Sequence, residues 1–122
     1  MQKQIYLLED DQGIREFIEF ILSSEGYDVQ SFSTVHSFLS RLGQRVPDLF
    51  ILDIMLPDGD GLEICQDLKK SDITKDTPVI MMSANSKKYE LQTDIKVEDY
   101  IAKPFDVDDF LRRVRIQLPS EL

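Results

Sequence analysis

The sequence predicts an α/β fold, in which helices cover a parallel β-sheet, and three observations lead to this prediction. Short apolar runs alternate with amphipathic stretches along the whole chain, which is the pattern of successive βα units. The runs at 5–8, 49–52 and 79–82 are continuously apolar, as expected for parallel strands that are covered on both faces. No repeat or Ser/Gly-rich linker interrupts the pattern. We therefore expect residues 1–122 to form a single domain of five βα units.

The first two units are read from residues 5 to 43. The apolar strand at 5–8 is followed by a helix that begins near Gln12, because apolar residues between 14 and 22 recur with helical spacing. Glu25-Gly26 ends this helix. Residues 27–32 alternate between apolar and polar, which indicates an edge strand, and 34–42 reads as a second helix closed by Gly43.

The runs at 49–52 and 79–82 are expected to be central strands, and the helix between them has Leu62, Cys65 and Leu68 on one side. We expect the cysteine and the methionines at 81 and 82 to be packing residues.

The last units are less regular. Residues 100–102 predict a fifth strand and 107–118 a final amphipathic helix. Residues 86–97 fit a helical repeat poorly, so we expect a fourth helix that is short or irregular.

Charge and composition exclude several classes of protein. The chain has 42% hydrophobic and 30% charged residues, which is typical of a folded globular domain. Fourteen basic against 23 acidic residues give a net charge of −9, so we expect neither direct nucleic-acid binding nor membrane association. The single cysteine cannot form an internal disulfide, and the run at 5–8 is too short for a signal peptide. We expect a cytoplasmic protein.

Polar residues collect where the predicted strands end. In an open parallel sheet, ligands bind beyond the carboxyl ends of the strands. The residues at these ends are Glu9, Asp10 and Asp11 after the first strand, Asp53 after the third, Ser83 after the fourth and Lys103 after the fifth.

Carboxylates from neighbouring strands repel one another by about 4 kcal/mol per pair at roughly 4 Å and an effective dielectric near 20. A hard divalent cation such as Mg²⁺ removes that repulsion. Asp11 has a simpler explanation as the cap of the first helix. Asp53 ends a central strand and could be a ligand, a base or a nucleophile that accepts a phosphoryl group. Lys103 would supply a positive charge and Ser83 a hydroxyl.

Four motifs, taken together and in order, resemble the receiver domain of bacterial two-component response regulators, from Lys3 to about Leu118. They are Glu9-Asp10, the stretch Asp53-Ile54-Met55-Leu56-Pro57-Asp58-Gly59-Asp60-Gly61-Leu62, Ser83-Ala84, and Tyr100-Ile101-Ala102-Lys103-Pro104-Phe105.

This resemblance implies a flavodoxin-like (βα)5 fold with strand order 2-1-3-4-5. It implies that Asp53 accepts a phosphoryl group from a sensor histidine kinase or a phosphotransfer protein, with slow self-dephosphorylation. Ser83 and Lys103 would contact the phosphoryl group, and Tyr100 would be the switch aromatic. The ligands of Mg²⁺ would be Glu9, Asp10, Asp53 and the carbonyl group of Met55. The Lys103–Pro104 peptide bond would be cis.

The chain also departs from the family pattern. The segment between Ser83 and Lys103 is shorter than usual and lacks the customary Gly-Ala turn before Tyr100. A standard dimer through the fourth helix is therefore in doubt. His36 is the sole histidine, and its place on the second helix favours a surface role over phosphotransfer.

Other functions are weighed against these residues. A phosphatase with an aspartate nucleophile would have a second acid at position 55, and an electron carrier of this fold would not place acids around a flavin phosphate. A binding module that has lost phosphorylation would lack Asp53 or Lys103. The chain is expected to be a stand-alone receiver that acts on a downstream protein, or part of a longer regulator with a linked output domain.

Overall fold

A five-stranded parallel sheet forms the centre of the computed structural model, which describes residues 2–84 and 97–119. Its order is β2-β1-β3-β6-β7, with β1 Gln4–Leu8, β2 Asp28–Phe32, β3 Leu49–Asp53, β6 Val79–Ser83 and β7 Asp99–Ala102. If only the five strands of this sheet are numbered along the chain, their order across the sheet is 2-1-3-4-5. The predicted strand order and fold are therefore confirmed. The predicted fourth helix and the poorly periodic segment at 86–97 lie almost wholly outside the described residues.

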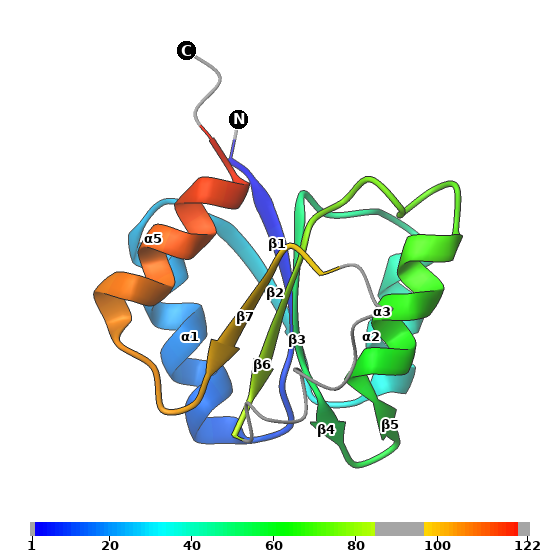
Figure 1. Cartoon of the computed structure of the whole chain (residues 1–122), viewed down its shortest axis with the longest axis horizontal. Helices are drawn as coiled ribbons and strands as arrows, with labels where there is room; N and C mark the ends of the chain where they lie inside the picture. The colour runs from blue at the N-terminus through cyan, green and yellow to red at the C-terminus, as the bar shows by residue number, and fades with distance from the viewer. Residues whose placement is uncertain (1, 85–96, 120–122) are drawn as a thin grey trace.

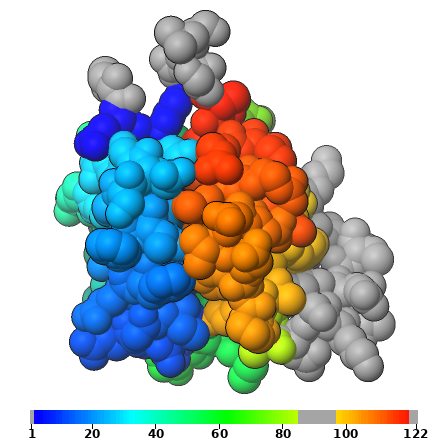
Figure 2. Space-filling model, turned by 90° about the vertical axis from the view of Figure 1, so that its left-hand side faces the viewer, coloured from blue at the N-terminus to red at the C-terminus, as the bar shows by residue number. Residues whose placement is uncertain are grey.

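Helices cover both faces of the sheet. One face carries α1 (Gln12–Ser24) and α5 (Val107–Gln117), and the other carries α2 (Val35–Leu42) and α3 (Gly61–Lys70) (Figure 1). Figure 2 looks onto the first face, where α1 and α5 lie side by side. None of the helices within the described ranges combines the length and the apolar character that a membrane-spanning helix needs.

The core has two halves because side chains alternate along each strand. Ile5 and Leu7 of β1 belong to the cluster under α1 and α5, whereas Tyr6 and Leu8 belong to the cluster under α2 and α3. Every residue of β1, β3 and β6 is buried, as the continuous apolar runs predict. Cys65, Met81 and Met82 are fully buried, which confirms them as packing residues.

The helix ends follow local sequence signals. The Asp11 carboxylate accepts a hydrogen bond of 2.9 Å from the Ile14 backbone amide, which confirms Asp11 as the cap of α1. After α1, Gly26 adopts a φ of 89°, a left-handed conformation that glycine reaches without steric cost. The predicted end of this helix at Glu25-Gly26 is therefore confirmed.

An antiparallel hairpin after Asp53 was not predicted. Its strands are β4 (Met55–Leu56) and β5 (Gly59–Asp60), with Pro57 and Asp58 in the turn. Each strand has two residues, which is too short for a periodic pattern, although Pro-Asp-Gly is a recognisable turn signal. The hairpin connects the end of β3 to the start of α3.

Candidate functional site

Strand register brings the predicted site residues to one edge of the sheet. Leu8 pairs with Leu52, Asp53 pairs with Met82, and Ser83 pairs with Ala102. Residues 9, 53, 83 and 103 therefore stand at adjacent strand ends, as the sequence predicts. Glu9, Asp53 and Ser83 are buried, which is unusual for polar side chains without a functional or structural partner.

Lys103 joins the two buried carboxylates. Its Nζ lies 2.5 Å from Glu9 Oε1 and 3.2 Å from Asp53 Oδ2. The Lys103 side chain is 14% exposed, and those of Glu9 and Asp53 are 0% and 9% exposed. Burial opposes the charged form of Lys103, but its hydrogen bond to Glu9 and the nearby charge of Asp53 raise the pKa of the ammonium group on balance. The site therefore holds a fixed positive charge at neutral pH.

Three carboxylates form a compact cluster beside this lysine. One oxygen from each of Glu9, Asp10 and Asp53 lies within 4.8 Å of the other two. Burial, followed by the neighbouring Asp53 carboxylate, raises the pKa of Glu9 to about 8, although Lys103 acts in the opposite direction. Within residues 2–84 and 97–119, Glu9 Oε2 is buried and has no hydrogen-bond partner. A buried acceptor without a partner is costly, so this oxygen is suited to a cation ligand.

Backbone contacts hold the strand ends in place. Arg15 of α1 donates from Nη1 to the carbonyl oxygens of Glu9 at 3.0 Å and Asp10 at 3.3 Å. The Lys103 amide donates to the Ser83 carbonyl at 2.8 Å. The Lys103–Pro104 peptide bond is cis, which confirms that part of the resemblance.

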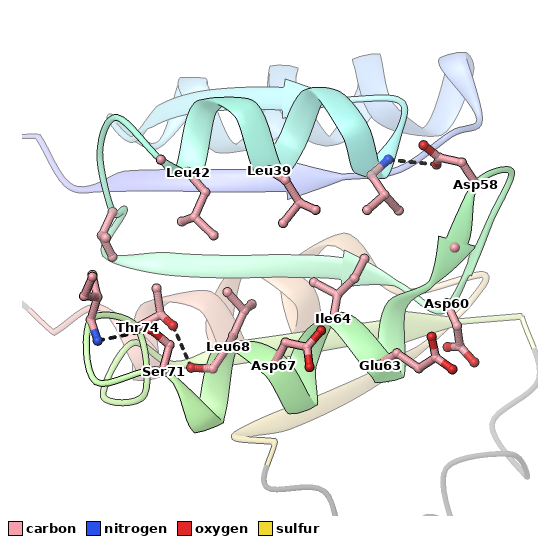
Figure 3. Close-up of a pocket in the computed structure, with 15 residues that line it drawn as sticks. Leu39, Leu42, Asp58, Asp60, Glu63, Ile64, Asp67, Leu68, Ser71 and Thr74 are labelled. Carbon is pink, nitrogen blue, oxygen red and sulfur yellow. Dashed lines mark hydrogen bonds between the residues drawn. The ribbon is translucent and has the colours of Figure 1, made fainter.

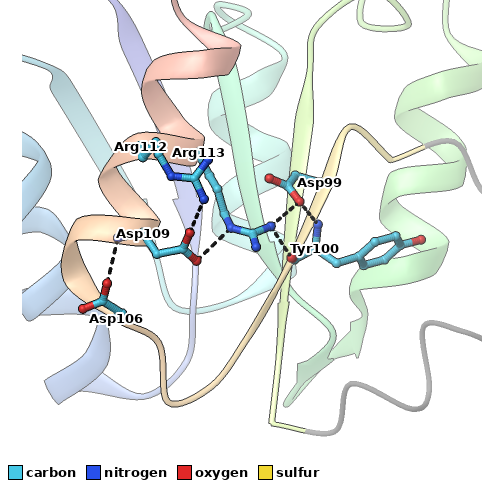
Figure 4. Close-up of polar contacts among 6 residues, drawn as sticks. All are labelled: Asp99, Tyr100, Asp106, Asp109, Arg112 and Arg113. Atoms are coloured by element: carbon cyan, nitrogen blue, oxygen red, sulfur yellow. Dashed lines mark hydrogen bonds and ion pairs between the residues drawn. The ribbon is translucent and has the colours of Figure 1, made fainter.

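An ion-pair cluster anchors the strand that leads to Lys103 (Figure 4). Arg113 of α5 contacts Asp99 at 2.6 Å and Asp109 at 2.9 Å, and it donates to the Tyr100 carbonyl at 3.2 Å. The Tyr100 ring points away from this cluster and packs against the apolar cluster under α2 and α3. Burial raises the pKa of its hydroxyl. The backbone of Tyr100 is therefore fixed from one side of the sheet while its ring lies on the other.

Two positioning residues were missed by sequence reasoning. Gly61 donates from its amide to the Ile54 carbonyl at 2.7 Å, and a Cβ at Gly61 would lie 2.0 Å from the Asp53 carbonyl oxygen. Asp58, in the hairpin turn, accepts hydrogen bonds from the Val35 amide at 2.8 Å and the His36 amide at 3.2 Å. The Pro-Asp-Gly turn signal could have located the hairpin, but no local signal indicates its contact with α2.

Two further residues singled out from the sequence, Met55 and His36, contribute no side chain to the carboxylate cluster. Met55 follows Asp53 by two residues in β4, and its side chain is exposed. His36 is an exposed residue of α2, whose N-terminus contacts the hairpin and not the carboxylate cluster.

Comparisons with known proteins identify the family. The sequence pattern of the response regulator receiver domain matches residues 5–115. The chain belongs to the response regulator receiver domain family. Phosphorylation and Mg²⁺ are characteristic of this family, which serves signalling in two-component systems, where response regulators interact with histidine kinases and output domains.

Individual relatives agree with this assignment. The response regulator ArlR of Staphylococcus epidermidis is 37% identical over 116 residues, which cover 93% of this chain and 52% of that protein. A CheY-like receiver domain protein from Methanospirillum hungatei is 27% identical, with a TM-score of 0.87 over 97% of this chain and 94% of that one. The BeF3-activated DrrB receiver domain is 28% identical, with a TM-score of 0.85 over 98% of this chain and 100% of that one. The chain spans about half the length of the curated relatives it matches.

Proposed function

We propose that this receiver accepts a phosphoryl group on Asp53 from a phosphohistidine of a sensor histidine kinase or phosphotransfer protein. The observation that carries the proposal is the position of Asp53 at a central strand end, with Oδ2 3.2 Å from Lys103 Nζ and inside a three-carboxylate cluster. An Asp53 oxygen attacks phosphorus, the P–N bond to imidazole breaks, and its electron pair stays on the imidazole nitrogen. Attack of water on the same phosphorus would release phosphate slowly and restore the carboxylate.

The same proposal assigns Mg²⁺ to the carboxylate cluster. Glu9, Asp10 and Asp53 offer hard oxygen ligands, and the Met55 carbonyl lies two residues beyond Asp53. The buried Glu9 Oε2, which has no hydrogen-bond partner among the described residues, supports the fit. When bound, Mg²⁺ offsets the negative charge of the transferred group.

Lys103, Ser83 and Tyr100 complete the proposed machinery. The Lys103 ammonium group is already held at the site by the Glu9 and Asp53 carboxylates. It would pair with the phosphoryl oxygens in place of a carboxylate oxygen. The Ser83 hydroxyl would donate to a phosphoryl oxygen from the end of β6. Tyr100 follows Asp99 on the neighbouring strand β7 and would respond to a displacement of Ser83.

The surface beside Lys103 supports a protein as phosphodonor. A pocket of about 310 Å³ is lined by Ile14, Phe17 and Phe105 together with Lys103. Phe17 is 46% exposed, so an apolar contact area borders the site. A kinase domain could bury this area while it presents its phosphohistidine to Asp53.

We further propose that residues 1–122 are one receiver domain that acts in the cytoplasm through a downstream partner. The central five-stranded sheet, with a core cluster on each face, supports one domain. The extra length of the curated relatives supports a covalently linked output domain, and a separate partner protein is the alternative.

Incubation with Mg²⁺ and acetyl phosphate tests the proposal. Intact-mass spectrometry should show one added phosphoryl group that hydroxylamine removes, and Asp53→Asn should abolish it. Asp76→Asn is the matched control, because Asp76 is an exposed acid outside the carboxylate cluster. Labelling of Asp53→Asn at the wild-type level would overturn the assignment.

A further inference from the structure

An apolar groove runs between α2 and α3, on the face of the sheet opposite α1 and α5 (Figure 3). It has a volume of about 510 Å³. Figure 3 shows Leu39 and Leu42 pointing from α2 toward Ile64 and Leu68 of α3. We call this feature the α2–α3 groove; its apolar lining includes Leu39, Leu42, Val46, Ile64, Leu68 and Ile73.

The groove leaves large apolar side chains in contact with water. Leu39 is 51% exposed and Ile73 is 76% exposed, whereas Ile64 and Leu68 form a buried floor. Contiguous exposed apolar surface with a polar rim is typical of an interaction site. The size of the groove is within the range of pockets that accept several apolar groups at once.

The rim of the groove is acidic. Asp58, Asp60, Glu63 and Asp67 line it, and no basic side chain is among the described residues that do so. Hydrogen bonds from the Val35 and His36 amides lower the pKa of Asp58, so that carboxylate stays ionised well below neutral pH. Glu63 and Asp67 lie one turn apart on α3, alongside the apolar floor. The groove therefore combines an apolar floor with a fixed negative border.

The apolar floor and the acidic rim together restrict which kinds of molecule can bind in the groove. A nucleic acid or an anionic membrane surface would be repelled by the four carboxylates. A second copy of this chain carries a net charge of −9 and would meet the same repulsion. A helix with an apolar stripe flanked by Lys or Arg would pack its apolar side chains against the floor of the groove and pair its basic side chains with the acidic rim.

We propose that the α2–α3 groove binds a cationic amphipathic helix of a partner protein. The apolar side chains of that helix, at i, i+3, i+4 and i+7, contact Leu39, Ile64 and Leu68. Its basic side chains pair with Glu63 and Asp67. The groove shares none of its lining residues with the carboxylate cluster, so it is a separate site from the proposed phosphoryl acceptor.

The test uses the full chain and a synthetic peptide of roughly 15 residues, long enough to form a helix, with leucines at helical spacing and lysines elsewhere. Isothermal titration at low salt should show binding that weakens as salt increases. Methyl NMR shifts should change at Leu39, Ile64 and Ile73. A peptide of the same composition with its leucines scrambled should bind at least roughly tenfold more weakly, since it has no apolar stripe.

Paired variants separate the groove from general electrostatics. The double variant Glu63→Gln, Asp67→Asn should weaken binding roughly fivefold, because two exposed ion pairs are lost. The control Glu16→Gln, Glu25→Gln removes the same charge from α1 and its C-terminal cap residue, on the other face, and should leave affinity unchanged. Leu39→Lys, at an exposed position, should abolish binding without loss of fold.

Four results would overturn the proposal. They are no binding of the striped peptide, equal binding of the scrambled peptide, equal weakening by the α1 control, and NMR shifts that map to another surface. Self-association of the chain through the groove, seen by sedimentation without the peptide, would also replace the proposed partner by a second copy.

Discussion

Substitution of Gly61 should disturb the fold and the carboxylate cluster together. Gly61 begins α3 directly against the end of β3, and an alanine Cβ would lie 2.0 Å from the Asp53 carbonyl oxygen and 3.0 Å from Ile54 Cα. Ordinary contact begins near 3.4 Å, so α3 and Asp53 would have to separate by roughly 1.4 Å. The atoms in conflict belong to backbone, which has no alternative rotamer to relieve the clash.

The expected loss can be estimated from opposing terms. Overpacking a well-packed site costs about 1–3 kcal/mol and sometimes more, and a clash with buried backbone belongs at the upper end. Alanine regains up to about 1 kcal/mol over glycine in a helix. Gly61→Ala should therefore lower the free energy of unfolding by about 2 kcal/mol or more, from a total of about 5–15 kcal/mol.

Urea denaturation followed by circular dichroism measures this difference. Gly13→Ala is the matched control, because Gly13 lies in α1 and the nearest atom to its Cβ would be Asp11 Oδ1 at 3.4 Å. That variant should be unchanged or more stable by about 0.5 kcal/mol. If Gly61→Ala proved as stable as the wild type, the close approach of α3 to Asp53 would be refuted.

Three further predictions concern the metal, the hairpin and the cysteine. Mg²⁺ at about 100 times its Kd should stabilise the fold by about 2.7 kcal/mol; Asp10→Asn should remove this gain in a thermal melt and raise stability in EDTA, because it removes one charge from the carboxylate cluster. Asp58→Ala should destabilise α2 at neutral pH, and since the pKa of Asp58 is lowered by the amides of α2, the difference from the wild type should vanish as pH falls through that pKa; a constant difference would contradict the capping role. Burial raises the pKa of the Cys65 thiol to about 11 from 9.0, so its contribution to stability should be complete below about pH 9 and be lost between about pH 9 and 11. Cys65→Ala should lack that loss in urea melts across this range, and rapid reaction of native Cys65 with a thiol reagent at pH 8 would contradict its burial.

The sheet could be predicted from sequence because its signals are local. A strand buried on both faces needs a continuous apolar run, and 49–52 and 79–82 are such runs. The site followed from the sheet, because parallel strands end at the same edge and carry their terminal residues there. Asp53 was therefore expected near Lys103, although 50 residues separate them in the chain.

The residues that position the site could not be predicted, because their partners lie far away in the sequence. Asp58 caps a helix that begins 23 residues earlier, and nothing next to either residue indicates the pair. Gly61 looks like an ordinary helix start, yet the space it leaves is what allows α3 to touch the carbonyl of Asp53. Local sequence patterns predict which polar residues lie at a strand end. The distance between two backbone segments, in contrast, depends on how the whole fold packs. A motif can therefore identify Asp53, but the close approach of α3 to its backbone depends on the glycine at position 61.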